Sequence, residues 1–417
     1  MMRSRRPAGP GLRAAARLLV ALLATIAVRA EEPPADPDLS TEGMRRAGPF
    51  HLRPYAVLKD VGYDDNVRIE ARTRQGDSTA TAGAGLDAVL LAGDRGGVHL
   101  FEELNYVAFQ KNTDLDHWNG SARARGIALL KGTVLSLEDR FASDRERPNT
   151  EIDERLRRTN NSLTGAFHTV GKGRLGLKGS LRDERIDYVS DDPLLPNVGD
   201  LLNRDETTLS VIGEMRVLPK TTFTLEGSVS RIQFDDKSQD RDTRKRAILP
   251  GFRFDPGAAV QGDLRVGPLD MTALERDGGS YHGLAGDGHL STRLGRAARL
   301  KSEFTRGVEF STLGSNLFFV SRSWSLALEQ FFSRRISGEL LYRSGFNHYP
   351  LEVPLRLSPG IMGIRDDRLT TWQATVRYRT KSQMILTASA YRLTRDSTDD
   401  FYDTGRAFYT FGTTYTY

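Results

Sequence analysis

The histidines and their polar neighbours are the residues in this sequence most able to do chemistry. Of the seven histidines, only His282 lies in a suggestive context, the run Gly278-Gly279-Ser280-Tyr281-His282-Gly283. In an extended chain Ser280 and His282 would face the same way. Nucleophilic catalysis also needs a third group that orients the base, and a glycine- and serine-rich loop explains the run without chemistry. We therefore expect no catalytic residues.

Carboxylates are the next candidates. Asp64, Asp65 and Asn66 offer oxygen ligands of the kind calcium prefers, but the EF-hand spacing is absent and such residues are common in turns. Glu102 and Glu103 are adjacent, so in a strand they face opposite sides and cannot form an acid–base pair. Because no zinc spacing and no phosphate-binding glycine loop occurs, the sequence predicts neither a metal site nor a cofactor.

Basic residues two positions apart recur in several segments, and this spacing puts both side chains on one face of a strand, about 6.5 Å apart. One hypothesis is a solvated wall of mutually paired charges, which we favour for most of them. The other is a binding track for an anionic glycan, in which arginines pair with carboxylates. The residues that lie opposite the apolar face of their segments are Arg123, Arg125, Arg174, Lys178, Arg182, Arg299, Lys301, Arg377 and Arg379.

The elements that must position these side chains are strands. From Phe50 onward the dominant hydrophobic period is two rather than 3.6, most clearly in residues 207–217, 222–229 and 371–379. Between the alternating segments, eight short turns and nine long polar loops interleave strictly. This arrangement predicts eighteen antiparallel strands with both chain ends on one side; weak patterning in residues 257–274 leaves sixteen as an alternative.

The composition favours a transmembrane barrel. The chain has no cysteine, its mean hydropathy is −0.44, and no run of eighteen apolar residues follows Val28, so a spanning helix is not expected. Strands that alternate lipid-facing apolar and lumen-facing polar residues keep the average hydropathy low. Closure removes the sheet edges, whose unpaired groups would be costly in lipid. The predicted fold is therefore an all-β, antiparallel transmembrane β-barrel.

The two chain ends agree with this fold. Arginines precede an apolar core at residues 18–28, and Val28-Arg29-Ala30 follows, which predicts a signal peptide over residues 1–30. This segment holds six arginines and no acid; without it, 53 basic residues face 54 acidic ones, so nothing argues for nucleic acid. Residues 31–49 are expected to be a flexible periplasmic tail, and residues 50–417 the barrel.

Aromatic residues mark both the last strand and the strand ends. Alternate aromatic residues close the chain and resemble the terminal strand that the outer-membrane assembly machinery recognises: Tyr409, Phe411, Tyr415 and Tyr417. Others are expected to form lipid-facing girdles. Those beside the long loops are Phe109, Trp118, Phe141, Tyr188, Phe234, Phe310, Phe318 and Phe346.

Three short motifs resemble those of β-barrel porins that accompany bacterial exopolysaccharide synthesis and export. They are Tyr63-Asp64-Asp65-Asn66-Val67 after the first strand, Arg365-Asp366-Asp367 before a late strand, and Arg395-Asp396-Ser397 at the start of the final loop. The next residue is Thr398, where members of that family often have asparagine. The resemblance implies an outer-membrane channel for a secreted polysaccharide.

We therefore expect a passive channel in the outer membrane of a Gram-negative bacterium, the terminal component of an exopolysaccharide export machine. The expected partners are outer-membrane lipid, the barrel assembly machinery, periplasmic or inner-membrane export components and the polysaccharide cargo. The alternatives are a diffusion porin for small solutes and, in a second class, a barrel enzyme or a structural or adhesin barrel. The sequence leaves open the cargo and its charge, the oligomeric state and whether the loops plug the pore.

Overall fold

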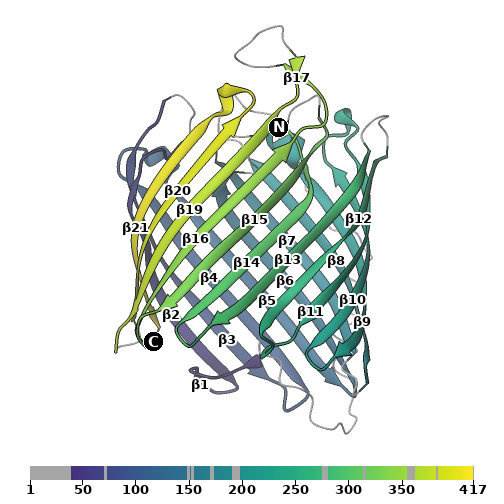
Figure 1. Ribbon diagram of the computed structural model, residues 1–417. Coiled ribbons are helices and arrows are strands. Elements are labelled where there is room, and N and C mark those ends of the chain that lie inside the picture. The colour runs from purple at the N-terminus through teal and green to yellow at the C-terminus, as the bar shows by residue number, and fades with distance from the viewer. Residues whose placement is uncertain are drawn as a thin grey trace, which may run out of the picture.

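The computed structural model describes residues 39–69, 73–147, 151, 155–169, 173–189, 198–274, 280–312, 316–354, 362–381 and 384–416. The predicted signal peptide, residues 1–30, lies outside the described residues. Within them, one antiparallel sheet closes on itself, because β2 (Phe50–Asp64) pairs with β21 (Thr404–Thr416). Figure 1 shows the tilted strands forming a cylinder, with the first and last strands side by side.

Eighteen strands form this wall, which confirms the larger predicted count over the alternative of sixteen. Each strand pairs with the next wall strand along the chain. Between β2 and β21 they are β3 (Asp77–Leu91), β4 (Gly96–Phe109), β5 (His117–Leu130), β6 (Thr133–Glu146), β7 (Leu156–Thr169), β8 (Leu175–Val189), β9 (Arg204–Leu218), β10 (Thr221–Phe234), β11 (Thr243–Phe254), β12 (Val260–Ala273), β13 (Tyr281–Leu294), β14 (Ala298–Phe310), β15 (Phe318–Phe331), β16 (Ile336–His348), β19 (Asp366–Arg379) and β20 (Met384–Ser397).

Residue alternation decides which side chain faces out. Along β9, Leu209, Val211 and Met215 are exposed, whereas Glu214 on the opposite face is buried. The same alternation runs round the wall, so one face presents apolar side chains and the other presents polar and charged ones. In a closed sheet the continuous apolar face belongs in lipid and the polar face lines the lumen.

Short turns gather at one end of the cylinder and long loops at the other (Figure 1). The shortest turns have two residues, as between β5 and β6, where Gly132 has a φ of 73°. Glycine adopts this left-handed conformation without steric cost, and tight hairpins need it. Several long loops carry small elements: η2 (Thr113–Leu115), α2 (Val198–Leu202), η3 (Lys237–Gln239), β17 (Val353–Pro354), β18 (Met362–Gly363) and η4 (Asp400–Tyr402).

The predicted tail is not wholly irregular. Within residues 31–49, β1 (Arg45–Ala47) pairs antiparallel with the first residues of β2. β2 begins at Phe50, but its pairing with β21 starts only at Tyr55. The first residues of β2 therefore have an edge that β21 does not cover, and β1 pairs with that edge. No helix among the described residues is long and apolar enough to cross a membrane.

The predicted girdle beside the long loops is partly wrong. Trp118 and Phe141 are exposed on the outer face, but five of the eight aromatics are buried: Phe109, Tyr188, Phe234, Phe310 and Phe318. The rings of Phe234 and Phe310 meet edge to face, with centroids 4.9 Å apart. Such burial at the mouth excludes these rings from the lipid interface. Phe109, Tyr188 and Phe234 point into the barrel, because each is in step with polar residues on the lumen face of its strand.

For Phe310 and Phe318 the cause lies in the β14–β15 hairpin. β14 pairs with β13 only as far as Arg306, while its pairing with β15 continues to Phe310 and Phe318. The upper end of the hairpin therefore separates from β13 and leans over the lumen. Its aromatic side chains pack on the inner side of β10 and β12, against Ile232 and Met271.

Candidate functional site

A pocket of about 550 Å³ lies on the lumen wall formed by β4 to β8. Arg123 on β5 and Arg140 on β6 are direct cross-strand partners, and Arg182 on β8 enters the same pocket. All three face the lumen, because cross-strand partners such as Arg123 and Arg140 share a face of the sheet and Arg182 lines the same pocket. We call this the basic pocket. It is also lined by His99, Phe101, Ser121, Asn160 and Ser162.

Each arginine of the basic pocket is held by a neighbour. Arg123 Nη2 lies 2.8 Å from His99 Nδ1, whose other nitrogen lies 2.5 Å from Asp87. Arg140 donates to Glu138. Arg182 Nη2 donates to Glu184 over 2.8 Å. These carboxylates are not part of the pocket lining.

The contacts of Arg140 and Arg182 orient these two guanidinium groups without using all their donors. A guanidinium has five N–H donors, and the side chains of Arg140 and Arg182 stay 59% and 49% exposed. Arginine donors in this arrangement suit a carboxylate or another small anion. Chemically, the basic pocket can hold a small anion beside its guanidinium groups.

The far wall carries a different arrangement of charge. Lys301 Nζ lies 3.1 Å from Glu329 and 2.9 Å from Glu339. Arg299 and Arg377 each lie 3.9 Å from one of these two glutamates. This part of the wall matches the hypothesis of mutually paired charges.

The remaining predicted lumen residues are divided between paired positions and the short-turn rim. Arg125 lies 3.9 Å from Glu138, and Lys178 donates to Glu214 over 2.8 Å. Arg174 precedes β8 in a turn, and Arg379 is the last residue of β19, so both lie at the short-turn end of the wall. The structure brings only Arg123 and Arg182 of the predicted set into the basic pocket.

Sequence reasoning missed Arg140 and His99. Arg140 follows Asp139 in a segment with charges on both faces, so its face was ambiguous. The signal that identifies it is its cross-strand partner, Arg123, which depends on the register of β5 and β6.

Loops from opposite walls meet over the mouth. Glu151, in the β6–β7 connection, accepts hydrogen bonds from the Ser311 hydroxyl over 2.5 Å and from the Thr312 hydroxyl over 2.8 Å. Six strands separate β7 from β14 on one side and eight separate β15 from β6 on the other. This contact, the mouth latch (Glu151, Ser311 and Thr312), therefore crosses the opening.

Further contacts fix the same loops. Arg241 Nη1 donates to the Leu201 carbonyl over 2.9 Å, and its Nη2 donates to the Ser311 carbonyl. The Asn316 side chain both donates to and accepts from the backbone of Leu351, over 3.1 and 2.9 Å. The β14–β15 connection thus links several loops at this end of the barrel into one connected layer.

The Tyr63–Val67 motif clamps the barrel seam. The Arg406 guanidinium binds the Asp64 carboxylate, with Nη2 2.5 Å from Oδ2. Asp65 accepts from the Ala407 N–H over 2.6 Å, and Asn66 Nδ2 donates to the Gly405 carbonyl over 3.1 Å. These side chains, whose oxygens were considered as calcium ligands, join the end of β2 to β21.

The two other motifs meet in a buried cluster above the wall. Arg365 donates two hydrogen bonds to Asp367, at 2.9 and 2.7 Å, and both side chains are fully buried. Arg365 also lies over the rings of Tyr349 and Tyr402, and Arg395 donates to the Tyr402 carbonyl over 2.5 Å. Burial disfavours the charge, but the bonds to Asp367 outweigh it and raise the pKa of Arg365. The motif residues therefore support the loops.

Two further groups bear on catalysis and metals. His282 Nδ1 lies 2.5 Å from Asp270, which is its direct partner across β12 and β13, so the histidine of the glycine-rich run is engaged by an acid. On the lumen face of the same strands, Asp263, Asp287 and His289 offer ligand atoms within 4.8 Å of one another. Arg265 already donates to Asp287 over 2.8 Å, so a metal ion would compete with a guanidinium there.

Comparisons with known proteins concern the family and the fold. A family model described as "Putative beta-barrel porin 2" matches residues 36–411. No curated protein sequence matched. Among solved structures, OccK2 (OpdF) of Pseudomonas aeruginosa is 12% identical with a TM-score of 0.50, covering 88% of this chain and 97% of that one. OpdK of the same organism (11%, 0.48, 88% and 98%) and OpdO (14%, 0.47, 88% and 97%) are also similar. At these identities the likeness concerns the fold alone.

Proposed function

We propose that this chain, which belongs to the family of β-barrel porins that its sequence matches, is a passive outer-membrane channel for small anionic solutes. The family and the closed barrel support a location in the outer membrane. In bacterial outer-membrane barrels the short turns are periplasmic and the long loops extracellular, and we propose the same orientation here. The observation that carries the proposal is the basic pocket, where Arg123, Arg140 and Arg182 gather on the lumen wall.

The strength of binding fits a channel rather than a receptor. Cargo that must leave the pore needs weak contacts at several sites. Exposed charge pairs contribute about 0.2–1 kcal/mol each. The binding free energy of a small carboxylate in the pocket would therefore be large enough to select it and too small to trap it in the pore.

The mouth supports small solutes over a polymer. The mouth latch joins loops of opposite walls, and the Arg241 and Asn316 contacts extend the covering layer. A polymer in transit would have to break these contacts for as long as it passed. A small solute needs only the space between them.

Exopolysaccharide export is the second candidate, supported by the resemblance of the three motifs. The contacts of Asp64 and Arg365 give those motifs a structural use, so they do not by themselves identify a cargo. Under this candidate, periplasmic or inner-membrane export components would dock at the short-turn end. Under either candidate, the exposed aromatic residues of β21 would be read by the barrel assembly machinery.

A deletion strain separates the two candidates. We expect lower uptake of small carboxylates, restored by the wild-type gene, with surface polysaccharide unchanged. Purified protein in liposomes should then pass small carboxylates faster than neutral sugars of equal size. Loss of surface polysaccharide with normal solute uptake would favour export and reject the diffusion channel.

A further inference from the structure

The outer face of β10 and β11 changes abruptly from apolar to basic. Reading towards the long-loop end, exposed Leu225 and Val229 on β10 are followed by Arg231. On β11, exposed Ile248 gives way to Arg246 and Arg244. Alternation keeps all these side chains on the lipid-facing side. The three arginines, the outer arginine cluster, therefore lie at the upper border of the apolar band.

Their spacing concentrates positive charge. Arg231 and Arg244 are direct cross-strand partners, and Arg246 lies two residues from Arg244 on the same face. Like charges directly opposite one another destabilise a sheet. All three are exposed, and none makes an ion pair with any residue in the described part of the chain. An anion from outside the chain would offset this repulsion.

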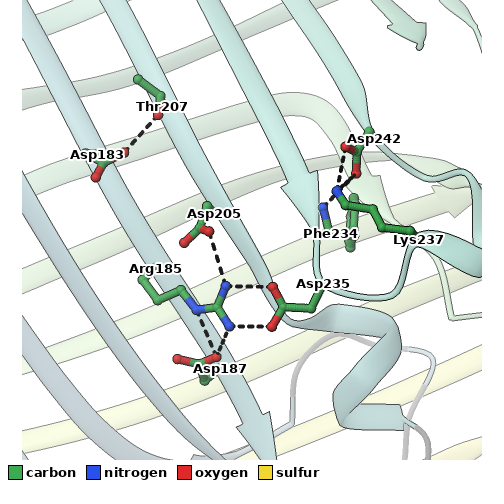
Figure 2. Close-up of polar contacts among 9 residues, drawn as sticks. All are labelled: Asp183, Arg185, Asp187, Asp205, Thr207, Phe234, Asp235, Lys237 and Asp242. Atoms are coloured by element: carbon green, nitrogen blue, oxygen red, sulfur yellow. Dashed lines mark hydrogen bonds and ion pairs between the residues drawn. The ribbon is translucent and has the colours of Figure 1, made fainter. Parts of the chain in front are cut away.

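The neighbouring acids are already engaged. Figure 2 shows Arg185, on the outer face of β8, surrounded by Asp187, Asp205 and Asp235. The separations of the charged atoms are 2.5, 3.3 and 2.5 Å. Closer to the cluster, Asp270 faces Arg246 across β11 and β12, but its carboxylate lies 2.5 Å from His282. Arg185 is thus paired with three carboxylates. Among the described residues, no carboxylate pairs with the three arginines of the outer arginine cluster.

We propose that the outer arginine cluster binds the phosphate groups of a phosphorylated lipid in the outer leaflet. Guanidinium groups bind phosphate through paired, charge-assisted hydrogen bonds. The height of the cluster is that of a lipid headgroup, because the apolar residues directly below it face acyl chains. A soluble phosphate would gain the charge contacts only, whereas a lipid gains both these contacts and burial of its chains beside Val229 and Ile248.

The test removes the charges and counts bound lipid. The triple variant Arg231→Gln, Arg244→Gln, Arg246→Gln is purified in mild detergent and titrated with bis-phosphorylated lipid A, followed by native mass spectrometry. The matched control is Arg296→Gln, Arg334→Gln, Arg335→Gln, which removes three exposed arginines from the short turns. Each purified variant is also run on a gel before and after heating. A sample that migrates more slowly after heating was a folded barrel before it. A second variant, with lysine at the same three outer positions, keeps the charge and loses the paired geometry.

We expect the outer triple variant to bind lipid A between about tenfold and about a hundredfold more weakly than wild type. The control should bind as wild type does, and the lysine variant should fall between. Dephosphorylated lipid A should bind wild type and the triple variant equally. The proposal is overturned if the folded triple variant retains wild-type binding, if dephosphorylated lipid binds wild type as tightly as lipid A, or if inorganic phosphate at equal concentration displaces the lipid.

Discussion

Thr312 and Glu151 stand in connections on opposite walls of the barrel, and the Thr312 hydroxyl donates a hydrogen bond of 2.8 Å to the Glu151 carboxylate. The backbone N–H of Thr312 donates to the same carboxylate over 2.5 Å. One side chain thereby joins two long loops that are 161 residues apart in sequence. Because hydrogen bonds to a charged group contribute about 1.5–3 kcal/mol each, this contact restrains the mouth.

Removing the carboxylate should open the mouth. Glu151→Ala loses every bond of the mouth latch, so we expect a higher mean single-channel conductance in planar bilayers and faster liposome uptake of small solutes. Glu352→Ala removes an exposed acid from another long loop and should leave conductance unchanged. Equal conductance of Glu151→Ala and wild type would show that the latch does not limit passage.

The basic pocket should set the affinity for anionic solutes. Replacing Arg123, Arg140 and Arg182 with glutamine should raise the half-saturating concentration for a small carboxylate several-fold, since each exposed contact is weak. The matched variant replaces Arg299, Lys301 and Arg377, which removes the same charge from the far wall. It should change ion selectivity and leave the half-saturating concentration close to wild type. A shift of equal size in both variants would mean that overall lumen charge, not the pocket, selects solutes.

The buried Arg365–Asp367 pair should stabilise the loop layer. Asp367→Asn leaves a buried guanidinium without its carboxylate, at a cost of about 3–5 kcal/mol. We expect faster protease cleavage of the extracellular loops in intact cells, with the barrel still folded. The double variant Arg365→Met, Asp367→Leu removes both charges and should be cleaved more slowly than Asp367→Asn. If the single variant resists protease as wild type does, the pair is not what holds these loops.

The aromatic face of β21 should matter for assembly. Tyr409, Phe411 and Tyr415 are exposed on the lipid-facing side, and Phe411 pairs with Val61 of β2 at the seam; Tyr417 lies outside the described residues. Phe411→Asp puts a charge in lipid at a cost below the ~2–4 kcal/mol given for Arg or Lys at midplane. Assembled barrel should fall and precursor should be degraded. Thr414→Asp, on the opposite face, is the control, and equal damage from both would show that the faces carry no separate signal.

Orientation can be read by labelling, because the native chain contains no cysteine. Asp400→Cys lies in the last long loop and should react with a membrane-impermeant maleimide on intact cells. Lys131→Cys lies in the two-residue turn between β5 and β6 and should react only after the outer membrane is permeabilised. Labelling of Lys131→Cys on intact cells would invert the topology.

The eighteen strands and their lipid-facing sides could be predicted from the sequence because both depend on near neighbours. A period of two decides which residues share a face, as in Leu209, Val211 and Met215, and a turn such as Lys131-Gly132 decides where a strand reverses. The signal peptide stays a prediction.

Which side chains meet was decided only by the tertiary structure. Arg123 reaches Arg140 through the register of β5 and β6, and Arg182 joins them from a strand two positions further round the wall. Phe310 alternates as a lipid-facing residue, yet it is buried because its hairpin leaves β13 and leans over the lumen. Glu151 and Thr312 touch only because the sheet closes and brings distant loops over one opening. Alternation fixes the direction of a side chain, whereas register, closure and loop path determine its neighbours, and these depend on contacts between residues far apart in the chain.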